Sequence, residues 1–186
     1  MASALQASLR RSGKARLCNV SIGFALASEG DTPDELLKKA DTALYASKAA
    51  PNTSVKQFVP EMREAADQKR AQLELARLAV SKDWLVPYYQ PKVSLPDGNI
   101  VGWEALLRID HPKEGILPPI AVSVALEHPH LGHAIGQRMM MRVLADMRSF
   151  ADQAEIPMQV AVNLSSATLY DQQFADWLLG ALKRTK

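Results

Sequence analysis

Two charged side chains, Glu104 and Arg108, stand in the stretch NIVGWEALLRIDHP, residues 99–112, whose other members are mostly apolar. A buried charge without a partner loses its hydration, at a cost on the order of several kcal/mol. Either this stretch is a surface helix, or the two charges hold a ligand. Valine, tyrosine and isoleucine are frequent on both sides of the nearby Asp97-Gly98 turn, and this composition favours a β-hairpin strand. The sequence therefore predicts that both side chains bind something.

The expected strand has two different faces, because successive side chains of a strand point to opposite sides. One face carries Gly102, Glu104, Leu106 and Arg108, and the other carries Val101, Trp103, Ala105, Leu107 and Ile109. Such a strand suits a barrel wall, whose apolar side packs on helices while its inner side lines a site. A structural salt bridge across strands is the alternative interpretation of the two charges.

An amide side chain, Asn163, follows in a second apolar stretch, MQVAVNLSSATL at residues 158–169. This stretch is predicted to form another buried strand. Its two faces carry Val160, Val162 and Leu164 on one side and Ala161, Asn163 and Ser165 on the other. The side chains around the amide are small and leave room for a ligand, which makes Asn163 a further candidate site residue.

The segments that position these residues alternate between strands and helices. Residues 17–27 alternate as a strand, and the next helix begins with Thr32 as N-cap and Glu35 closing a capping box. This helix should end near residue 50, because Pro51 disfavours helical geometry before it. Its apolar stripe is predicted to contain Leu37, Ala40 and Leu44. Further helices are predicted for residues 61–81, 119–128, 131–153 and 172–185, and the alternation predicts an α/β fold.

Composition limits the partners of this chain. Its 186 residues include 22 basic and 20 acidic side chains, for a formal net charge of +2, so no strong field points to nucleic acid or an anionic membrane. The single cysteine, Cys18, excludes an internal disulfide framework and is compatible with a reduced cytoplasm. No apolar run reaches the roughly 20 residues that span a bilayer. We therefore expect a cytoplasmic segment that binds neither nucleic acid polymers nor membranes.

Three histidines, His128, His130 and His133, lie close together in the sequence. They straddle Pro129 and lack the i, i+4 spacing of a helical metal site, so surface positions are favoured over a metal cluster. The methionines at helical spacings within residues 131–153 are predicted to fill a core.

The run PYYQPKVSLPDGNIVGWEALLRIDHPKEG, residues 87–115, followed by ALEHP and VAVNLSS, resembles the N-terminal half of the EAL domain. That family consists of cyclic di-GMP phosphodiesterases on a TIM-type barrel. The resemblance therefore implies a partial TIM-type (β/α) barrel and a protein that hydrolyses cyclic di-GMP to the linear dinucleotide in bacterial signalling.

Two earlier runs, VSIGFAL and ADTALYASK, resemble the late strand and final helix of a GGDEF diguanylate cyclase domain. The two families often occur in tandem, joined by a helix like the one predicted for residues 61–81. The chain is therefore divided into a GGDEF-like end at 1–55, a linker helix at 56–83 and the first part of an EAL domain at 84–186. Alternatively, the helix packs within one continuous domain or makes the parent a homodimer, although Lys69 interrupts its apolar stripe.

The EAL resemblance also assigns roles to individual residues. It implies that Glu104 and Asn163 hold Mg²⁺ or Mn²⁺, which agrees with the preference of hard cations for oxygen donors. It further implies that Arg108 holds a phosphate of the substrate, and that Gln90 and Leu106 contact the nucleotide. In the GGDEF-like part, Lys48 matches a phosphate-contacting lysine of a degenerate nucleotide site, because the arginine expected after it is replaced by Asn52.

A complete site is not expected in these 186 residues. A barrel of this type runs to roughly 250 residues, whereas residues 84–186 supply about 100. The later strands of the family, with further acidic ligands and a lysine, have no counterpart. We therefore expect an inactive fragment of an active parent. A parent that binds cyclic di-GMP without hydrolysing it is the alternative.

Overall fold

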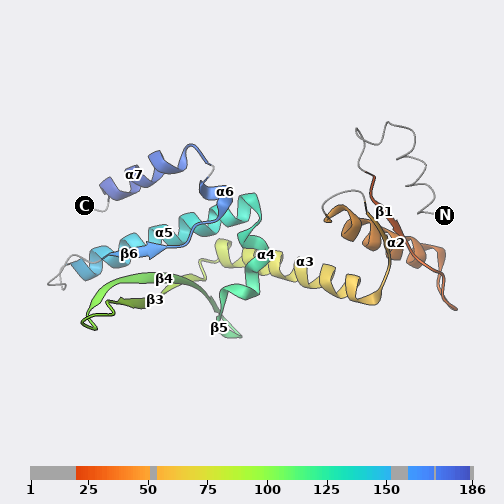
Figure 1. Cartoon of the computed structure of the whole chain (residues 1–186), viewed down its shortest axis with the longest axis horizontal. Helices are drawn as coiled ribbons and strands as arrows, with labels where there is room; N and C mark the ends of the chain where they lie inside the picture. Colours follow the sequence, from red (N-terminus) through yellow and green to blue (C-terminus); the bar gives the residue numbers. More distant parts are fainter. Residues whose placement is uncertain (1–19, 51–53, 152–158, 170, 185–186) are drawn as a thin grey trace. The chain divides into compact units, whose positions relative to one another are not determined.

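The computed structural model describes residues 20–50, 54–151, 159–169 and 171–184, which form two compact units, 1–70 and 71–186 (Figure 1). Cys18 and the first part of the strand predicted at 17–27 lie outside the described residues. The same holds for Asn52 and for the last two residues of the helix predicted at 131–153.

The described part of the first unit contains two short parallel strands, one helix between them in the chain and the start of a further helix. β1 (Ile22–Phe24) pairs with β2 (Val55–Gln57), and α2 (Pro33–Lys48) lies between them in the chain. The predicted capping box is confirmed, because Thr32 Oγ1 accepts from the backbone of Glu35 and the Glu35 carboxylate accepts from the Thr32 amide. Strand β2 was not predicted, since three residues are too few for a recognisable alternation.

The buried face of α2 differs from the prediction at one position. Leu37, assigned to the apolar stripe, is 62% exposed, whereas Ala43 and Ser47 are buried. The two three-residue strands cover only a narrow strip of the helix, and that strip follows Ala40, Ala43 and Ser47. Leu37 has a helical spacing to Ala40 but lies beyond the edge of this strip, so the prediction for Leu37 is wrong.

In the second unit, a four-stranded sheet is built around one long hairpin. β3 (Leu85–Val93) and β4 (Ile100–His111) pair antiparallel, and the Asp97-Gly98 turn joins them with Gly98 at a φ of 71°. β5 (Gly115–Leu117) pairs antiparallel with β4, and β6 (Val160–Val162) pairs parallel with it. The predicted hairpin and the strand conformation of the Glu104 segment are confirmed.

Two helical segments of the second unit pack on this sheet, namely α5 (Pro129–Ala151) against β3 and β6 and η2 (Pro119–Val122) against β4. The unit also contains α4 (Ser123–Leu126) and α6 (Ser166–Leu169), which contact α5, as well as α7 (Phe174–Arg184) and the C-terminal part of α3 (Pro60–Ser81). Figure 1 shows α5 running along the hairpin, and α5 contacts β3. Helix α3 begins in the first unit and ends in the second. The division at residues 55 and 83 stays a prediction.

A single cluster of buried side chains joins the helices to the sheet. It consists of Ala76, Ala79, Leu85, Ile109, Val122, Ala125, Ile135 and Met139. Met139 is 4% exposed, which confirms that it fills the core. Ala105 and Ile109 are buried on the apolar face predicted for β4, although Val101 at its start is exposed.

Strand β6 is shorter and less buried than predicted. It contains three residues, and Ala161 within it is exposed. The chain leaves the strand at Asn163 because a helix begins soon afterwards, where the Ser165 hydroxyl accepts from the amide of Thr168. A hydroxyl that accepts from a backbone amide three residues later favours a helix start over a strand. The expectation of a buried strand through Leu164 and Ser165 is therefore wrong.

A tyrosine on β3 should make the stability of the second unit sensitive to alkaline pH. Burial raises the pKa of the Tyr89 phenol, and so does its 2.6 Å hydrogen bond to Asp146 on α5. The unfolded chain releases this proton near the ordinary pH of about 10, so the stabilisation is present below that pH and decreases above it. We expect Tyr89→Phe to flatten the fall in the urea midpoint above pH 10.

Tryptophan fluorescence can measure this effect, since Trp84, Trp103 and Trp177 are the only tryptophans and all lie in the second unit. Tyr45→Phe, a change in the first unit, is the control and should keep the wild-type slope. Equal slopes for wild type and Tyr89→Phe would contradict the prediction.

Candidate functional site

The polar side chains of the hairpin gather on the sheet face that lies opposite the core. Gln90 pairs with Glu104 and Tyr88 with Leu106 across the two strands. Alternation along β4 puts Arg108 on this side as well, because the buried Ala105 and Ile109 occupy the other. We call this surface the polar face of the sheet, defined by Tyr88, Gln90, Glu104, Leu106 and Arg108.

The Glu104 carboxylate contacts the Asn163 amide. Strands β4 and β6 run parallel with Glu104 opposite Ala161, and Asn163 is the first residue after β6. Nδ2 of Asn163 donates a 2.8 Å hydrogen bond to Oε1 of Glu104. The structure therefore brings together two predicted site residues that are 59 positions apart in the sequence.

Arg108 contacts a backbone carbonyl and an aromatic ring rather than a carboxylate. Its Nη1 donates to the carbonyl of Leu107 at 2.8 Å, and its guanidinium carbon lies 5.7 Å from the centre of the Tyr88 ring. Among the described residues, no carboxylate forms an ion pair with Arg108. The alternative of a structural salt bridge between Glu104 and Arg108 is therefore not observed.

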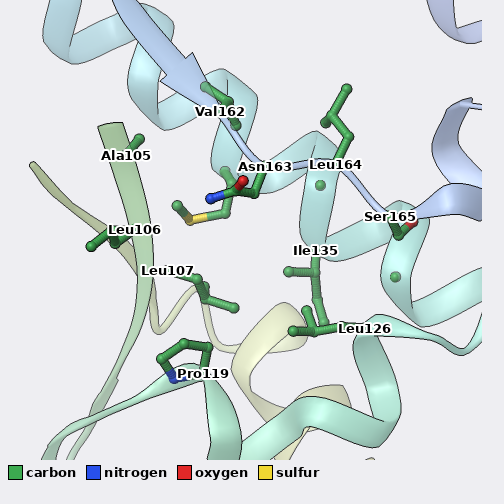
Figure 2. Close-up of a pocket in the computed structure, with 13 residues that line it drawn as sticks. Ala105, Leu106, Leu107, Pro119, Leu126, Ile135, Val162, Asn163, Leu164 and Ser165 are labelled. Atoms are coloured by element: carbon green, nitrogen blue, oxygen red, sulfur yellow. The ribbon is translucent and has the colours of Figure 1, made fainter. Parts of the chain in front are cut away.

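A cavity of about 300 Å³ is lined in part by Asn163, whereas Glu104 is not among its lining residues. Figure 2 shows Asn163 and Ser165 at its edge and Leu107, Leu126 and Ile135 along its wall. Leu106 and Leu107 lie on opposite sides of the β4 ribbon in the same view, as expected from strand alternation. Most of the side chains that line the cavity are aliphatic. Among the described residues, the polar side chains that line it are those of Asn163 and Ser165.

Close packing along α5 shapes this edge of the cavity. A Cβ atom on Gly132 would lie 2.4 Å from the carbonyl oxygen of Leu126 and 3.2 Å from Ser165 Oγ. A Cβ atom on Gly136 would lie 3.5 Å from Thr168 Oγ1. Gly132 therefore lets both Leu126 and the segment after β6 approach α5 closely, whereas the distance at Gly136 is that of an ordinary contact.

The remaining candidates do not join this site in the described structure. Lys48 is exposed in the last turn of α2, in the first unit. His130 is exposed, and His133 lies 3.5 Å from Asp171. Across the described ranges, no group of three or more His, Cys, Asp and Glu side chains is arranged to hold a metal ion. No described helix is both long and apolar enough to cross a membrane.

Tyr88 was not among the site residues predicted from the sequence. Tyr88 contacts Arg108 and lies on the polar face of the sheet, two positions before Gln90. The two-residue period of a strand places residues i and i+2 on one face, so this spacing was a usable signal.

Comparison with protein families gives two matches. Residues 71–186 match the EAL domain, and residues 1–54 match the diguanylate cyclase GGDEF domain. The chain thus has a GGDEF match followed by an EAL match, in the order predicted from the sequence.

Curated relatives are similar over most of this chain. The bifunctional diguanylate cyclase/cyclic di-GMP phosphodiesterase MucR of Pseudomonas aeruginosa is 33% identical over 167 residues, which cover 89% of this chain and 24% of MucR. The cyclic di-GMP phosphodiesterase PdeR of Escherichia coli is 31% identical over 153 residues, or 82% of this chain and 23% of PdeR. The chain thus spans about a quarter of the length of these relatives.

Solved structures support the same fold. The PaMucR phosphodiesterase in its c-di-GMP complex has a TM-score of 0.56 and 33% identity, over 61% of this chain and 46% of that one. The EAL enzyme Bd1971 in its cGMP-bound form has a TM-score of 0.60 and 21% identity, over 84% of this chain and 41% of that one. The predicted α/β fold with a partial EAL-type barrel is confirmed.

Proposed function

Because the chain belongs to the EAL domain family, we propose that it is a segment of a cyclic di-GMP phosphodiesterase that hydrolyses its substrate to the linear dinucleotide. One observation carries the proposal. The carboxylate of Glu104 and the amide of Asn163 meet at the junction of two parallel strands, on the sheet that also bears Arg108. A pair of oxygen-bearing side chains, on a sheet that also carries a guanidinium without a described acidic partner, suits a protein that binds a cation and a phosphate.

The chemistry of these two side chains fits a divalent metal ion. Rotation of the Asn163 side-chain amide by half a turn exchanges the positions of its nitrogen and its oxygen. After this rotation, the amide oxygen and the Glu104 carboxylate oxygen can face one ion without movement of the backbone. Mg²⁺ takes about six oxygen ligands, and Glu104 and Asn163 would supply two of them. Mn²⁺ accepts the same donors. When bound, the metal would activate a water molecule and neutralise phosphate oxygens.

The other residues on the polar face of the sheet would bind and orient the substrate. Arg108 can donate two parallel hydrogen bonds to one phosphate group, because its guanidinium is planar. Gln90, exposed and directly opposite Glu104, offers an amide to a polar edge of the guanine. Leu106 offers an apolar contact beside it. These roles orient the phosphodiester against the Glu104 and Asn163 pair.

The function is tested with the full gene product that contains this sequence. Purified protein with Mg²⁺ or Mn²⁺ should convert cyclic di-GMP to the linear dinucleotide, which chromatography separates from the substrate. We expect the 186-residue chain alone to show no turnover, because its described residues would supply two of the roughly six oxygen ligands of the metal. Turnover by the pure 186-residue chain would overturn the claim that further ligands are needed.

The alternative function is that of a receptor that binds cyclic di-GMP without hydrolysing it. Such a receptor has no need for metal ligands, so the Glu104 and Asn163 pair favours the enzyme. Binding of cyclic di-GMP by the full gene product with no hydrolysis in either metal would establish the receptor, and failure of both would reject the function altogether. We also propose a cytoplasmic location, and a homodimer of the parent is a proposal that its mass in solution tests.

A further inference from the structure

The guanidinium of Arg108 is partly buried and lacks an acidic partner within the described residues. A cation withdrawn from water without a counter-ion is unfavourable unless a ligand or a polarisable group compensates it. The contacts that Arg108 does make therefore determine where its charge is held before any substrate arrives.

Two contacts hold this guanidinium. The carbonyl of Leu107 accepts one N–H from Nη1, and the Tyr88 ring lies 5.7 Å from the guanidinium carbon. Arginine has five N–H donors in one plane, and these contacts use one donor and the attraction of the charge to the ring. The remaining donors stay available for a bidentate contact to an anion.

The strand register explains why Tyr88 can reach Arg108. Tyr88 is directly opposite Leu106, and Arg108 is directly opposite Val86. Tyr88 and Arg108 are therefore diagonal neighbours on one face, at a separation that aromatic and long side chains span. The tyrosine is 48% exposed, so its ring has not been withdrawn into the core.

We propose that Tyr88 is a positioning residue that supports the Arg108 guanidinium so that its free donors meet a phosphate of the substrate. The proposal rests on the function proposed above and adds a residue to it. The ring of Tyr88 attracts the cation through its face and limits the orientations of a long, flexible side chain. Substrate binding then costs less side-chain entropy, because the guanidinium group is already held in the orientation that binds the phosphate.

The test compares variants of the full gene product in cyclic di-GMP hydrolysis. Tyr88→Leu, which removes the ring, should raise KM about three- to ten-fold, the range expected for an exposed to partly desolvated cation–π contact. It should keep kcat within about two-fold, since the side-chain contact described for Tyr88 is to Arg108 and the Glu104 carboxylate is bonded to Asn163. Tyr88→Phe keeps the ring and should keep the wild-type KM.

Tyr45→Leu is the matched control. Tyr45 is 56% exposed and also has a cation, Lys69, 5.4 Å from its ring, but it lies in the first compact unit. This variant should leave KM unchanged. Tryptophan fluorescence during urea unfolding verifies that Tyr88→Leu is folded, because the three tryptophans are in the second unit.

A double-mutant cycle shows whether Tyr88 acts through Arg108. In an Arg108→Ala background, Tyr88→Leu should cause no further loss of kcat/KM. An equal loss in both backgrounds would mean that the ring acts independently and would overturn the proposal, as would a wild-type KM for Tyr88→Leu. Each of these results requires an active wild-type protein, so they leave the proposed function intact. If wild type binds without turnover, the dissociation constant replaces KM.

Discussion

Replacing Glu104 with glutamine is expected to lower kcat for cyclic di-GMP hydrolysis by about 100-fold or more in the full gene product. Glutamine has nearly the same size and can still bond to Asn163, so the fold should be kept. It lacks the negative charge that hard divalent cations favour. Loss of a group that only orients a metal ligand lowers metal affinity or activity by about 10- to 100-fold. Loss of the ligand itself should therefore lower the activity by about 100-fold or more.

Glu114→Gln is the control for this prediction. Glu114 is an exposed carboxylate in the turn between β4 and β5, so its neutralisation changes the net charge equally while sparing the polar face of the sheet. This variant should keep the wild-type rate. A Glu104→Gln protein with a wild-type kcat at saturating substrate and metal would refute the metal-ligand role.

Asn163→Asp distinguishes a cation site from a simple hydrogen bond in the same experiment series. A carboxylate at this position would face Glu104 at the distance of the present 2.8 Å contact, and two like charges so close repel each other. If a cation binds there, added Mg²⁺ or Mn²⁺ should restore the lowered melting temperature. A melting temperature that stays lowered in both metals would argue against a cation between the two residues.

Replacing Gly23 with alanine is expected to destabilise the first unit by about 3 kcal/mol or more, the upper end for overpacking. A Cβ atom at this position would lie 2.0 Å from the backbone nitrogen of Leu44 and 2.5 Å from the carbonyl oxygen of Ala40. Both contacts are to the backbone of α2, which cannot rotate away as a side chain can. Strand β1 and α2 would have to separate.

Hydrogen exchange measures this effect within each unit. Amide protection in α2 should fall in Gly23→Ala, while protection in α5 and the tryptophan-detected unfolding midpoint should not change. Ala27→Ser adds a single atom to an exposed position four residues later and should leave α2 protected. Wild-type protection of α2 in Gly23→Ala would show that β1 does not approach the helix as closely as described.

Local patterns were sufficient for the hairpin that carries Glu104 and Arg108 and for the start of α2. The Asp97-Gly98 turn between β-rich runs predicted the β3–β4 hairpin, and the spacing from Thr32 to Glu35 predicted the start of α2. The alternation along β4 predicted that Glu104 and Arg108 share a face. These features depend on backbone preferences and side-chain periods within a few residues, which the sequence displays directly.

Local patterns failed where the surrounding structure sets how much of an element is covered. Leu37 has a helical spacing to Ala40 yet is exposed, because the two short strands cover only a narrow strip of α2. Strand β6 ends after three residues because the hydroxyl of Ser165 begins a helix. The first outcome depends on which segments are nearby in space, and periodicity contains no such information. The second depends on a local cap, a signal that competes with the strand pattern in the same stretch of sequence.

The amino-acid sequence by itself determined the candidate residues, the faces they occupy and the family resemblance. Only the tertiary structure decided their partners. It paired Glu104 with Asn163, 59 residues away, and it put Tyr88 rather than a carboxylate beside Arg108. A side-chain period specifies the direction of each residue from its own backbone, whereas contact between distant residues depends on strand register and on how closely neighbouring segments approach each other.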